Sequence, residues 1–381
     1  VRGGGIYYWD TSAGTSSRAV DITTLSGNNQ PQVANIVLVS ERDRHVIAFG
    51  CDPQGDPGVL DPLTIRFSDQ ESFTDWAATA TNTAGELRVG TGSEIVSAVQ
   101  TKQQVIIFTD RSVSAMQFIG APFTFGLTEV STNTSILGQN AAVASGDAVY
   151  WMGDQVFYKY DGNVQPIPCP IEEYVFDNMN ITQRAKITAG LNSKFNEIWW
   201  FYPSIGSEVN DSYVAYNYVE NSWFYGTMNR TAWLDNALSN LPIATSTDGY
   251  IYFHEDGIND GSTNPPSPIS SYIESSAIDM GDGDQFMFVS RVIPDLTFRN
   301  STATPQATFE VSARDFPGAS FDQTNSGSAV RTSIAPVEQF TEQLFFRLRG
   351  RSMALKVSSN TLGTQWRLGT PRADMRTDGR R

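Results

Sequence analysis

The amino-acid sequence predicts an all-β fold, with an irregular β-propeller over residues 1–285 and a C-terminal β-sandwich-like domain over residues 286–381. Three observations predict it. Short apolar strands alternate with polar turns, several turns contain Asp-Gly pairs, and groups of strands recur every 45 to 60 residues or so. Irregular repeats of roughly this size are typical of propeller blades. A large irregular β-sandwich is the alternative that shares these features.

The clearest group of strands lies between Lys194 and Trp233. Aromatic and β-branched residues fill residues 198–202 and 213–218, and a third aromatic segment begins at Trp223. Polar residues with Gly, Pro and Asn separate these segments, so the pattern predicts three antiparallel strands. A flat meander cannot bury both of its aromatic faces alone. It therefore needs neighbouring sheets of the same kind.

Four other segments repeat this order of apolar strand, turn and strand. They are residues 33–49, 95–118, 141–167 and 242–253. An aromatic strand at residues 6–10 precedes them and, by analogy with other propellers, would complete the last blade. One helix is predicted at residues 170–178, because Pro170 suits a first turn, and Glu172 and Glu173 lie near the positive end of the helix.

Beyond residue 285 the pattern changes to six alternating strands separated by long polar loops. The strands are predicted at residues 286–293, 296–298, 307–314, 343–348, 353–357 and 366–368. The loops lie at residues 300–306 and 318–333. Strands that follow one another without helices favour a small sandwich or an outer layer on the propeller.

Charge is scarce and unevenly distributed. Only 18% of the 381 residues are charged, against a usual value of about 25%, which suits permanent subunit contacts. The net charge of −15 combines nine basic and three acidic residues at 341–381 with 17 basic and 38 acidic residues before them. This asymmetry predicts two surfaces with different partners, and the acidic body would repel nucleic acid.

Arg347, Arg349 and Arg351 alternate with smaller or apolar residues. In an extended strand their guanidinium groups would point the same way. Together with Arg372 and Arg376 they form the candidate assembly surface, which would bind an acidic partner; the alternative is a solvated strand face.

The sequence offers no catalytic residues, cofactor site or metal site. Its two cysteines, Cys51 and Cys169, and its two histidines, His45 and His254, lie in no recognisable catalytic pattern and are interpreted as structural. Six carboxylates lack the spacing of a calcium loop. They are Glu255, Asp256, Asp260, Asp279, Asp282 and Asp284.

Two further features are interpreted structurally. Ser68, Asp69 and Trp76 resemble the Asp-box turn of sialidase-type propellers, in which the Asp would bind loop amides and the Trp would fill a gap between blades. No apolar run is long enough to span a bilayer, so no membrane partner is predicted.

Three segments resemble the hub or nozzle proteins of short-tailed (podovirus-like) bacteriophages, a family that includes the P22-type packaged-DNA stabilisation protein and the T7-type tail tubular protein B. They are residues 141–168, residues 197–233 with the run Glu-Ile-Trp-Trp-Phe-Tyr-Pro, and residues 366–381 with Trp-Arg-Leu-Gly and the ending Asp-Gly-Arg-Arg. Together they cover under half of the chain.

The resemblance implies a structural virion protein that is assembled in the host cytoplasm and acts in DNA ejection. It would form a homo-hexameric ring that links the portal or adaptor proteins to the distal tail proteins. The ring would line the DNA channel without binding the passing DNA tightly. A chain of 381 residues is short for this family, so an additional platform or tip domain is expected to be missing.

A second function class remains open at this point. Exposed aromatic residues and many carboxylates are also typical of a carbohydrate-binding or glycoside-hydrolysing β-propeller.

Overall fold

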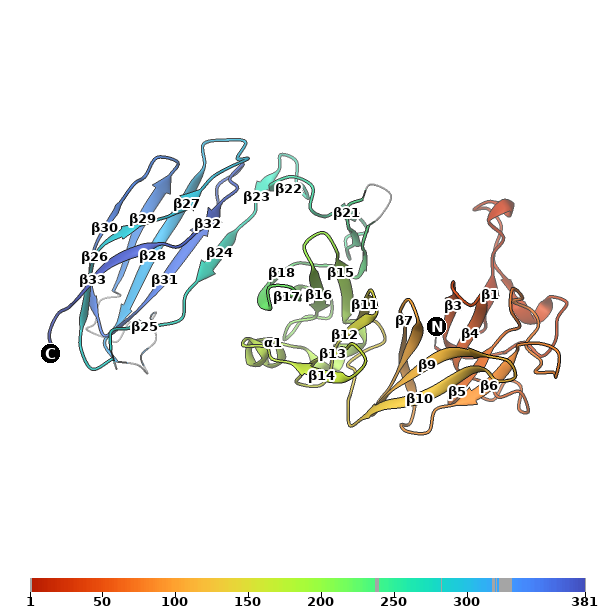
Figure 1. Cartoon of the computed structure of the whole chain (residues 1–381). Helices are drawn as coiled ribbons and strands as arrows, with labels where there is room; N and C mark the ends of the chain where they lie inside the picture. The colour runs from red at the N-terminus through yellow and green to blue at the C-terminus, as the bar shows by residue number, and fades with distance from the viewer. Residues whose placement is uncertain are drawn as a thin grey trace. The chain divides into compact units, whose positions relative to one another are not determined.

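The computed structural model describes residues 2–236, 240–281, 283–316, 319, 321 and 331–380. It is nearly all β, with 47% strand and 5% helix, and confirms the predicted fold class. The chain forms two compact units, Val1–Glu255 and Asp256–Arg381 (Figure 1). The first is an irregular propeller-like row of sheets and the second is a β-sandwich-like domain.

The first unit contains five antiparallel meanders in chain order. They comprise β3 (Ala34–Ser40), β4 (His45–Cys51), β5 (Asp61–Phe67) and β6 (Gly85–Arg88); β7 (Ile95–Gln100), β8 (Gln104–Thr109), β9 (Ser112–Gly120) and β10 (Thr124–Thr132); β11 (Ala142–Ser145), β12 (Ala148–Met152), β13 (Phe157–Tyr160) and β14 (Val164–Ile167); β15 (Thr188–Asn192), β16 (Glu197–Tyr202), β17 (Ser212–Asn217) and β18 (Ser222–Thr227); and β19 (Ala232–Leu234), β20 (Ile243–Thr245) and β21 (Ile251–Phe253). Every predicted group of strands is therefore present.

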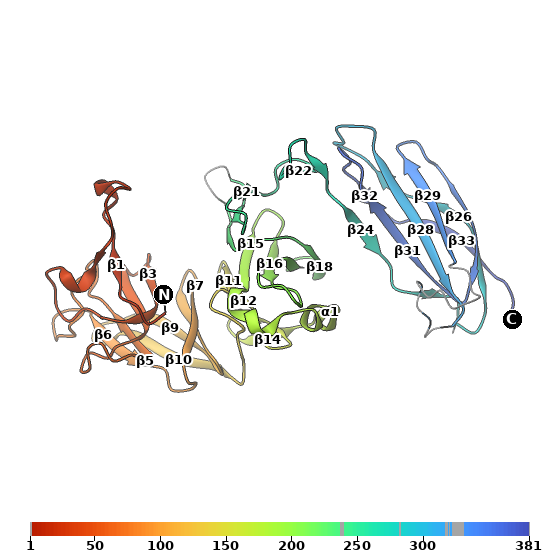
Figure 2. The same ribbon diagram turned by 180° about the vertical axis from the view of Figure 1, so that it is seen from behind.

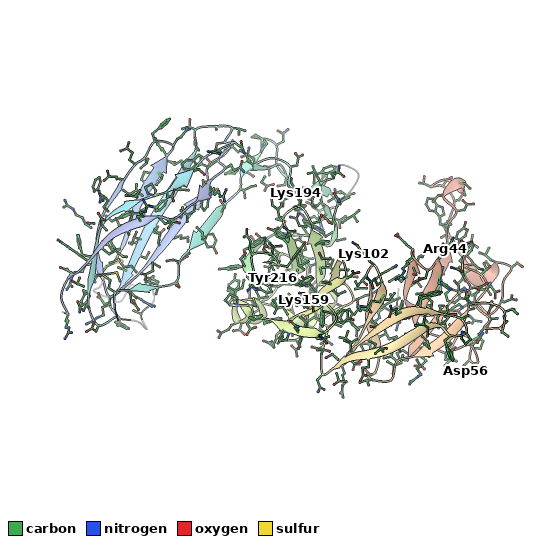
Figure 3. The ribbon with its side chains drawn as sticks, viewed as in Figure 1. Arg44, Asp56, Lys102, Lys159, Lys194 and Tyr216 are labelled. Carbon is green, nitrogen blue, oxygen red and sulfur yellow. The ribbon has the colours of Figure 1, made fainter. Side chains whose placement is uncertain are left out.

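Neighbouring sheets pack through shared apolar cores. One core joins the first and second sheets, and a larger one joins the second, third and fourth around Trp151 and Trp200. The first strands of successive sheets, β3, β7, β11, β15 and β19, lie next to one another. Tyr216 marks the boundary between the third and fourth sheets: its ring centroid lies 6.3 Å from that of Tyr150, and Lys159 lies nearby (Figure 3). The aromatic sheet β15–β18 is therefore covered by neighbouring sheets, as expected from the sequence.

The row of sheets is open at both ends. In the described part of the chain, no strand pairing joins the first sheet to the last, and the two lie apart in both ribbon views (Figures 1 and 2). The prediction that residues 6–10 complete the last blade is wrong. Instead β1 (Tyr7–Tyr8) pairs with β2 (Val20–Asp21), and Ile6 packs with Ile22 and Trp76 against the first sheet.

Helical structure is short. The predicted helix is confirmed as α1 (Glu172–Asp177), whose buried Val175 and Phe176 face the core. Three 3-10 helices complete it: η1 (Thr11–Ala13), η2 (Ile22–Thr24) and η3 (Ile181–Lys186). Among the described helices, none combines the length and apolar character needed to cross a membrane.

The second unit is a sandwich of two main sheets. One has the order β30 (Leu344–Gly350), β26 (Met287–Ile293), β33 (Arg372–Thr377). The other has the order β24 (Ser271–Glu274), β31 (Ser352–Ser359), β28 (Gln306–Arg314), β29 (Thr332–Glu338), and β25 (Ile278–Asp279) also pairs with β31. Two small ladders, β22 (Asn259–Asp260) with β23 (Ser267–Pro268) and β27 (Leu296–Thr297) with β32 (Arg367–Leu368), complete it. Its core includes Met287, Phe309 and Phe346.

The sandwich begins earlier in the chain than residue 286. Because β24 and β25 pair with β31, residues 271–279 belong to the second unit, and the compact units divide after Glu255. The six predicted strands are present, and β29 and β33 are additional. Both additional strands lie at sheet edges, where Pro336 and a series of charged residues are tolerated. Residues 322–330 of the predicted loop at 318–333 lie outside the described residues.

Candidate interaction surfaces

The predicted assembly surface lies on the outer face of the three-stranded sheet. In β30 the buried Leu344, Phe346 and Leu348 point inward, so Arg347 and Arg349 point outward, and Arg351 follows on the same side. The register places Arg349 and Arg376 opposite Phe288, one on each side of it. The structure therefore brings all of these arginines onto one face, with Arg372 farther along β33 opposite Ile293.

The five arginines differ in what they contact. Arg349 Nε donates to Asp378 Oδ2 at 2.7 Å, and its guanidinium lies 4.0 Å from the Phe286 ring centroid. Arg351 also lies over Phe286, at 4.7 Å, and donates to the carbonyl oxygen of Arg380 at 3.0 Å. These two side chains hold the end of the chain against the sheet. They are thus less available to a partner than the sequence pattern indicated.

Arg347, Arg372 and Arg376 remain directed at solvent. Within the described residues, the side chains of Arg347 and Arg372 make no ion pair or hydrogen bond, and the Arg376 guanidinium lies 5.0 Å from the Phe288 ring centroid. A neighbouring ion pair joins Arg291 and Asp374 at 2.6 Å. The positive charge that a partner would meet is therefore concentrated on these three arginines.

Aromatic side chains accompany this charge, and the sequence reasoning missed them. Phe345 is 76% exposed and lies on the same side of β30 as Arg347. Phe288, Phe345 and Arg347 line a shallow depression on this face. Exposed aromatic and arginine side chains are enriched where proteins bind one another. The alternation of Phe345, Arg347 and Arg349 in the sequence could have indicated that this aromatic side chain lies on the same side as the arginines.

The last sheet of the first unit presents an uncovered apolar face. The registers align Leu234, Ile243 and Phe253 in one row across the sheet, with Ile251 in the next row. Leu234, Phe253 and Ile251 are 57%, 61% and 63% exposed. On the opposite face, Trp233 packs on Trp199 of the fourth sheet. One face is thus packed as in the other sheets, and the other is open.

At the other end of the row, Ile6, Ile22 and Trp76 cover much of the outer face of the first sheet, but strand β3 keeps exposed apolar side chains there. Val37 and Val39 of β3 are exposed on the side that carries Ala48 and Trp76, away from the second sheet. The exposed apolar side chains at the two ends are different, so the two faces are not copies of one another.

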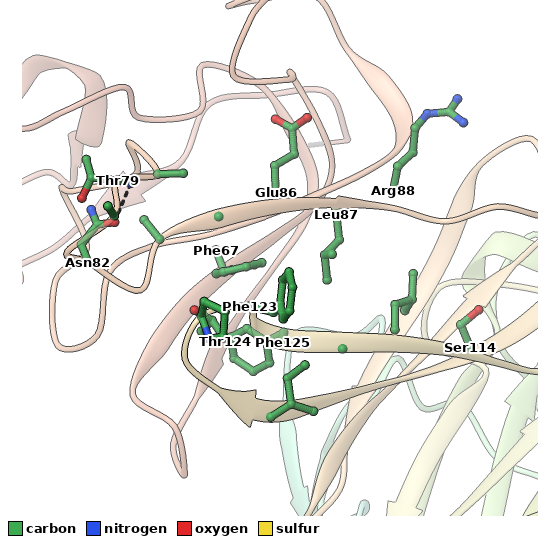
Figure 4. A pocket seen from close by; sticks show the side chains of 18 of the residues that line it. Phe67, Thr79, Asn82, Glu86, Leu87, Arg88, Ser114, Phe123, Thr124 and Phe125 are labelled. Atoms are coloured by element: carbon green, nitrogen blue, oxygen red, sulfur yellow. Dashed lines mark hydrogen bonds between the residues drawn. The ribbon is translucent and has the colours of Figure 1, made fainter.

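A cavity of about 920 Å³ lies between β6 and β10, the outer strands of the first two sheets (Figure 4). Leu87 and the exposed Phe123 face it, whereas Glu86 and Arg88 point away from it (Figure 4). Polar and apolar groups line it in nearly equal measure.

The two thiols and the His45 imidazole are buried, and the His254 imidazole is half-buried. Burial raises the pKa of Cys51 to about 12 and that of Cys169 to about 11. Burial also lowers the pKa of His45, whose ring lies 5.2 Å from that of Phe125. Burial, and then the Arg230 guanidinium, lower the pKa of His254 to about 4. At neutral pH these thiols stay protonated and these imidazoles stay uncharged, as structural residues would.

Two of the interpretations of the carboxylates can be compared with the structure, the turn at Asp69 and the lack of a metal site. The Asp69 carboxylate accepts hydrogen bonds from the Thr83 amide and hydroxyl at 2.8 and 2.6 Å, which supports the structural interpretation of this turn. Trp76, however, is buried beside the first sheet and not between two sheets. In the described part of the chain, no three His, Cys, Asp or Glu side chains lie close enough to share a metal ion. Asp282 lies outside the described residues.

Comparisons with known proteins give weak structural similarities only. No family model and no curated relative matches the chain. The extracellular domain of a protein described as a one-component system from B. thetaiotaomicron is 10% identical with a TM-score of 0.41, and the match covers 67% of this chain and 30% of that one. A fungal alcohol oxidase is 10% identical with a TM-score of 0.40, covering 97% and 81%.

An exo-β-1,3-galactanase from Phanerochaete chrysosporium is 11% identical, with a TM-score of 0.30 and coverage of 98% and 99%. This chain spans less than a third of the length of the B. thetaiotaomicron domain chain. At these values the similarity is one of β-rich architecture, and none of the activities in these names is transferred to this chain.

Proposed function

We propose that this chain is a structural subunit of a bacteriophage virion, the ring-forming hub or nozzle of a short tail. In this role it would link portal or adaptor proteins to the distal tail proteins and surround the DNA channel. The observation that carries the proposal is the open apolar face of the last sheet, together with the exposed Val37 and Val39 at the opposite end of the row. The sequence resemblance to tail hub proteins supports the same role.

The open faces favour contact between copies of the chain. Within the row, each inner sheet is covered on both sides by its neighbours, whereas no sheet in the described structure covers the face with Leu234, Ile251 and Phe253. Burying one such side chain completely is worth about 1.5–3 kcal/mol. Because the two ends differ, one copy would meet the next head to tail, and such contacts generate rings when the rotation closes.

The charge of the first unit suits a DNA channel. This unit has 13 basic and 27 acidic residues, a net charge of −14, whereas the second has 13 basic and 14 acidic residues. Tight binding to DNA requires Lys and Arg that neutralise phosphates. A strongly acidic surface would instead let DNA pass without adhering to it.

Sedimentation velocity of the purified chain tests this proposal. The wild type is expected to form larger species as its concentration rises, and the double variant Leu234→Asp, Phe253→Asp is expected to stay monomeric. Val219→Asp is the matched control, because Val219 is 67% exposed in the turn after β17 and lies outside the open face. A wild type that remains monomeric at all concentrations, or a double variant that assembles like the control, would contradict the proposal.

One observation favours the alternative, a carbohydrate-binding propeller. Phe123, 73% exposed at the cavity between β6 and β10, offers an aromatic ring on which a sugar could stack. Under this alternative, the chain would bind a soluble polysaccharide in an affinity-electrophoresis panel, and Phe123→Ala would abolish the retardation. Absence of retardation by every polysaccharide leaves the assembly proposal in place.

A further inference from the structure

The two sheets of the sandwich are closed on one side and open on the other. At the open side the edge strand β33 of the three-stranded sheet faces the edge formed by β24 and β25 of the opposite sheet. An apolar cavity of about 400 Å³ lies between these edges. Its lining includes Ile273, Ile278, Val289, Met353, Ala373 and Met375.

Several side chains here face the core but remain exposed. Ile273 is paired with the buried Val357, Ile278 with the buried Met353, and Met375 with the buried Val289, so each lies on the inner side of its sheet. Nevertheless, Ile273, Ile278 and Met375 are 51%, 41% and 40% exposed. Aliphatic side chains on the inner face of a sandwich are normally covered by the opposite sheet. Among the residues that the structure describes, the core is therefore uncovered along this side.

The missing cover has the dimensions of one β-strand. The sheet that contains β33 has three strands, and the opposite sheet has four strand positions because β24 and β25 occupy one edge together. A strand added beside β33 would lie about 4.8 Å from it and about 10 Å from the β24–β25 edge, the normal spacings within and between sheets. It would also pair with the backbone edge of β33, which is the terminal strand of its sheet.

The outer side of β33 indicates the charge that such a strand would carry. Arg372, Asp374 and Arg376 alternate with the inward-facing Ala373 and Met375. Asp374 is already paired with Arg291 at 2.6 Å, so the two arginines supply the unbalanced charge. Residues directly opposite on neighbouring strands interact, and opposite charges stabilise the pair.

We propose that this side of the sandwich is a strand-acceptor site for an extended segment of a partner protein in which aliphatic residues alternate with Asp or Glu. The aliphatic side chains would fill the cavity against Ile273, Ile278 and Met375. The carboxylates would lie beside Arg372 and Arg376. Main-chain pairing gives such strand additions affinity, and alternate side chains give them specificity. The site is independent of the open faces of the first unit, so it stands whether or not the chain forms rings.

Fluorescence anisotropy with labelled synthetic peptides tests the site on the full chain. The probe is a blocked peptide of alternating valine and glutamate, about seven residues long to match the six residues of β33. Its controls are a scrambled peptide of the same composition and an alternating valine–lysine peptide. The valine–glutamate peptide is expected to bind, and the amides of residues 372–377 are expected to gain protection from hydrogen exchange.

Two variants separate the parts of the site. Met375→Glu places a carboxylate in the cavity on an exposed edge strand and is expected to abolish binding. The double variant Arg372→Glu, Arg376→Glu keeps the cavity and is expected to change the preference from the glutamate to the lysine peptide by roughly fivefold or more, the size of two cross-strand charge pairs. Matched circular dichroism spectra would show that both variants fold.

Other occupants give different results. Equal binding of the scrambled peptide, or no binding of the alternating peptide, would overturn the proposal. Displacement of the peptide by dodecanoate at low concentration would assign the cavity to an apolar small molecule instead. Self-association of the wild type that is lost in Met375→Glu but kept in Leu234→Asp, Phe253→Asp would assign it to a second copy of the chain.

Discussion

His254 is held in its uncharged form by its neighbours. Arg230 Nε donates to His254 Nε2 at 2.8 Å, and the Trp233 ring centroid lies 4.6 Å from that of the imidazole. Burial disfavours the charged imidazole, and protonation would also place a second positive charge beside Arg230, so the pKa falls to about 4 from its ordinary value of 6.5. His254 therefore ties the end of β21 to the loop before β19 only while it remains neutral.

This coupling predicts a stability change with pH. Because the folded-state pKa is lowered, the unfolded chain binds more protons between pH 4 and 6.5. The contribution of His254 is thus fully present above pH 6.5 and is lost as the pH falls toward 4, by at most about 3 kcal/mol. Chemical denaturation at pH 7.5 and 4.5 should show a smaller pH dependence in His254→Gln than in the wild type. An identical dependence in both would contradict the assignment.

Arg347 and Arg349 form a matched pair on one strand. Replacing Arg349 by Ala removes the contacts of its guanidinium with Asp378 and Phe286. The free energy of unfolding should therefore fall by about 1 kcal/mol, the sum expected of an exposed ion pair and a cation–π contact. Arg347→Ala should leave stability unchanged and weaken only partner binding. Thermal denaturation of both variants checks this, and an equal loss of stability in the two would show that Arg347 is structural as well.

At the scale of the elements, one aromatic side chain packs the last sheet against the fourth sheet, beside hydrogen bonds such as that from Thr188 to the Thr231 carbonyl oxygen. Trp233 of β19 packs against Gly190 of β15, and its Nε1 donates to the Leu191 carbonyl oxygen at 2.8 Å. A Cβ atom at Gly190 would lie 2.5 Å from the Trp233 ring, so only glycine permits this approach. The packing of Trp233, which helps to attach the sheet with the open apolar face, therefore depends on glycine at position 190.

Gly190→Val should release the last sheet while leaving the fourth sheet folded. The expected cost is about 1–3 kcal/mol, typical of overpacking. Hydrogen exchange should accelerate at residues 232–234 and 251–253 and stay slow at residues 197–202. Gly55→Ala is the control, because a Cβ atom there meets no neighbour within 4 Å. Unchanged protection of the last sheet in Gly190→Val would refute this role of Trp233.

The strands of the first unit could be predicted because their signal is local. Runs such as residues 198–202 alternate or concentrate aromatic side chains between polar turns, and each became a strand. β29 and β33 could not be predicted in this way, since Pro336 and the arginines of β33 have low strand preference and are tolerated only at a sheet edge. Edge position depends on the whole fold.

For the candidate assembly surface, the sequence could predict which side of the strand the arginines share but not which residues they contact. Alternation placed Arg347, Arg349 and Arg351 on one side, as the structure has them. That Arg349 pairs with Asp378 depends on β33 returning beside β26, which no local pattern shows. The early start of the sandwich was missed for the same reason, because β24 pairs with a strand about 80 residues away.

For the whole molecule, the two units differ in charge, with −14 on the first and −1 on the second. If the basic residues serve assembly, charge reversal at Arg347, Arg349, Arg351, Arg372 and Arg376 should slow or block attachment to a ring partner. The rim charges guide docking more than they hold it, because salt screens them within about 10 Å.

Binding to duplex DNA should remain weak in the wild type and in that variant at ordinary salt, as measured by fluorescence anisotropy. Tight, salt-sensitive binding by the wild type that disappears on charge reversal would identify the arginines as a nucleic-acid site.

Electron microscopy of the purified full chain tests ring formation directly, because the next copy of the chain would cover the open apolar face of the last sheet. We expect closed rings in the wild type and their loss in Leu234→Asp, Phe253→Asp, with Val219→Asp still forming rings. Single particles the size of one chain in the wild type, at concentrations well above those used for sedimentation, would contradict it.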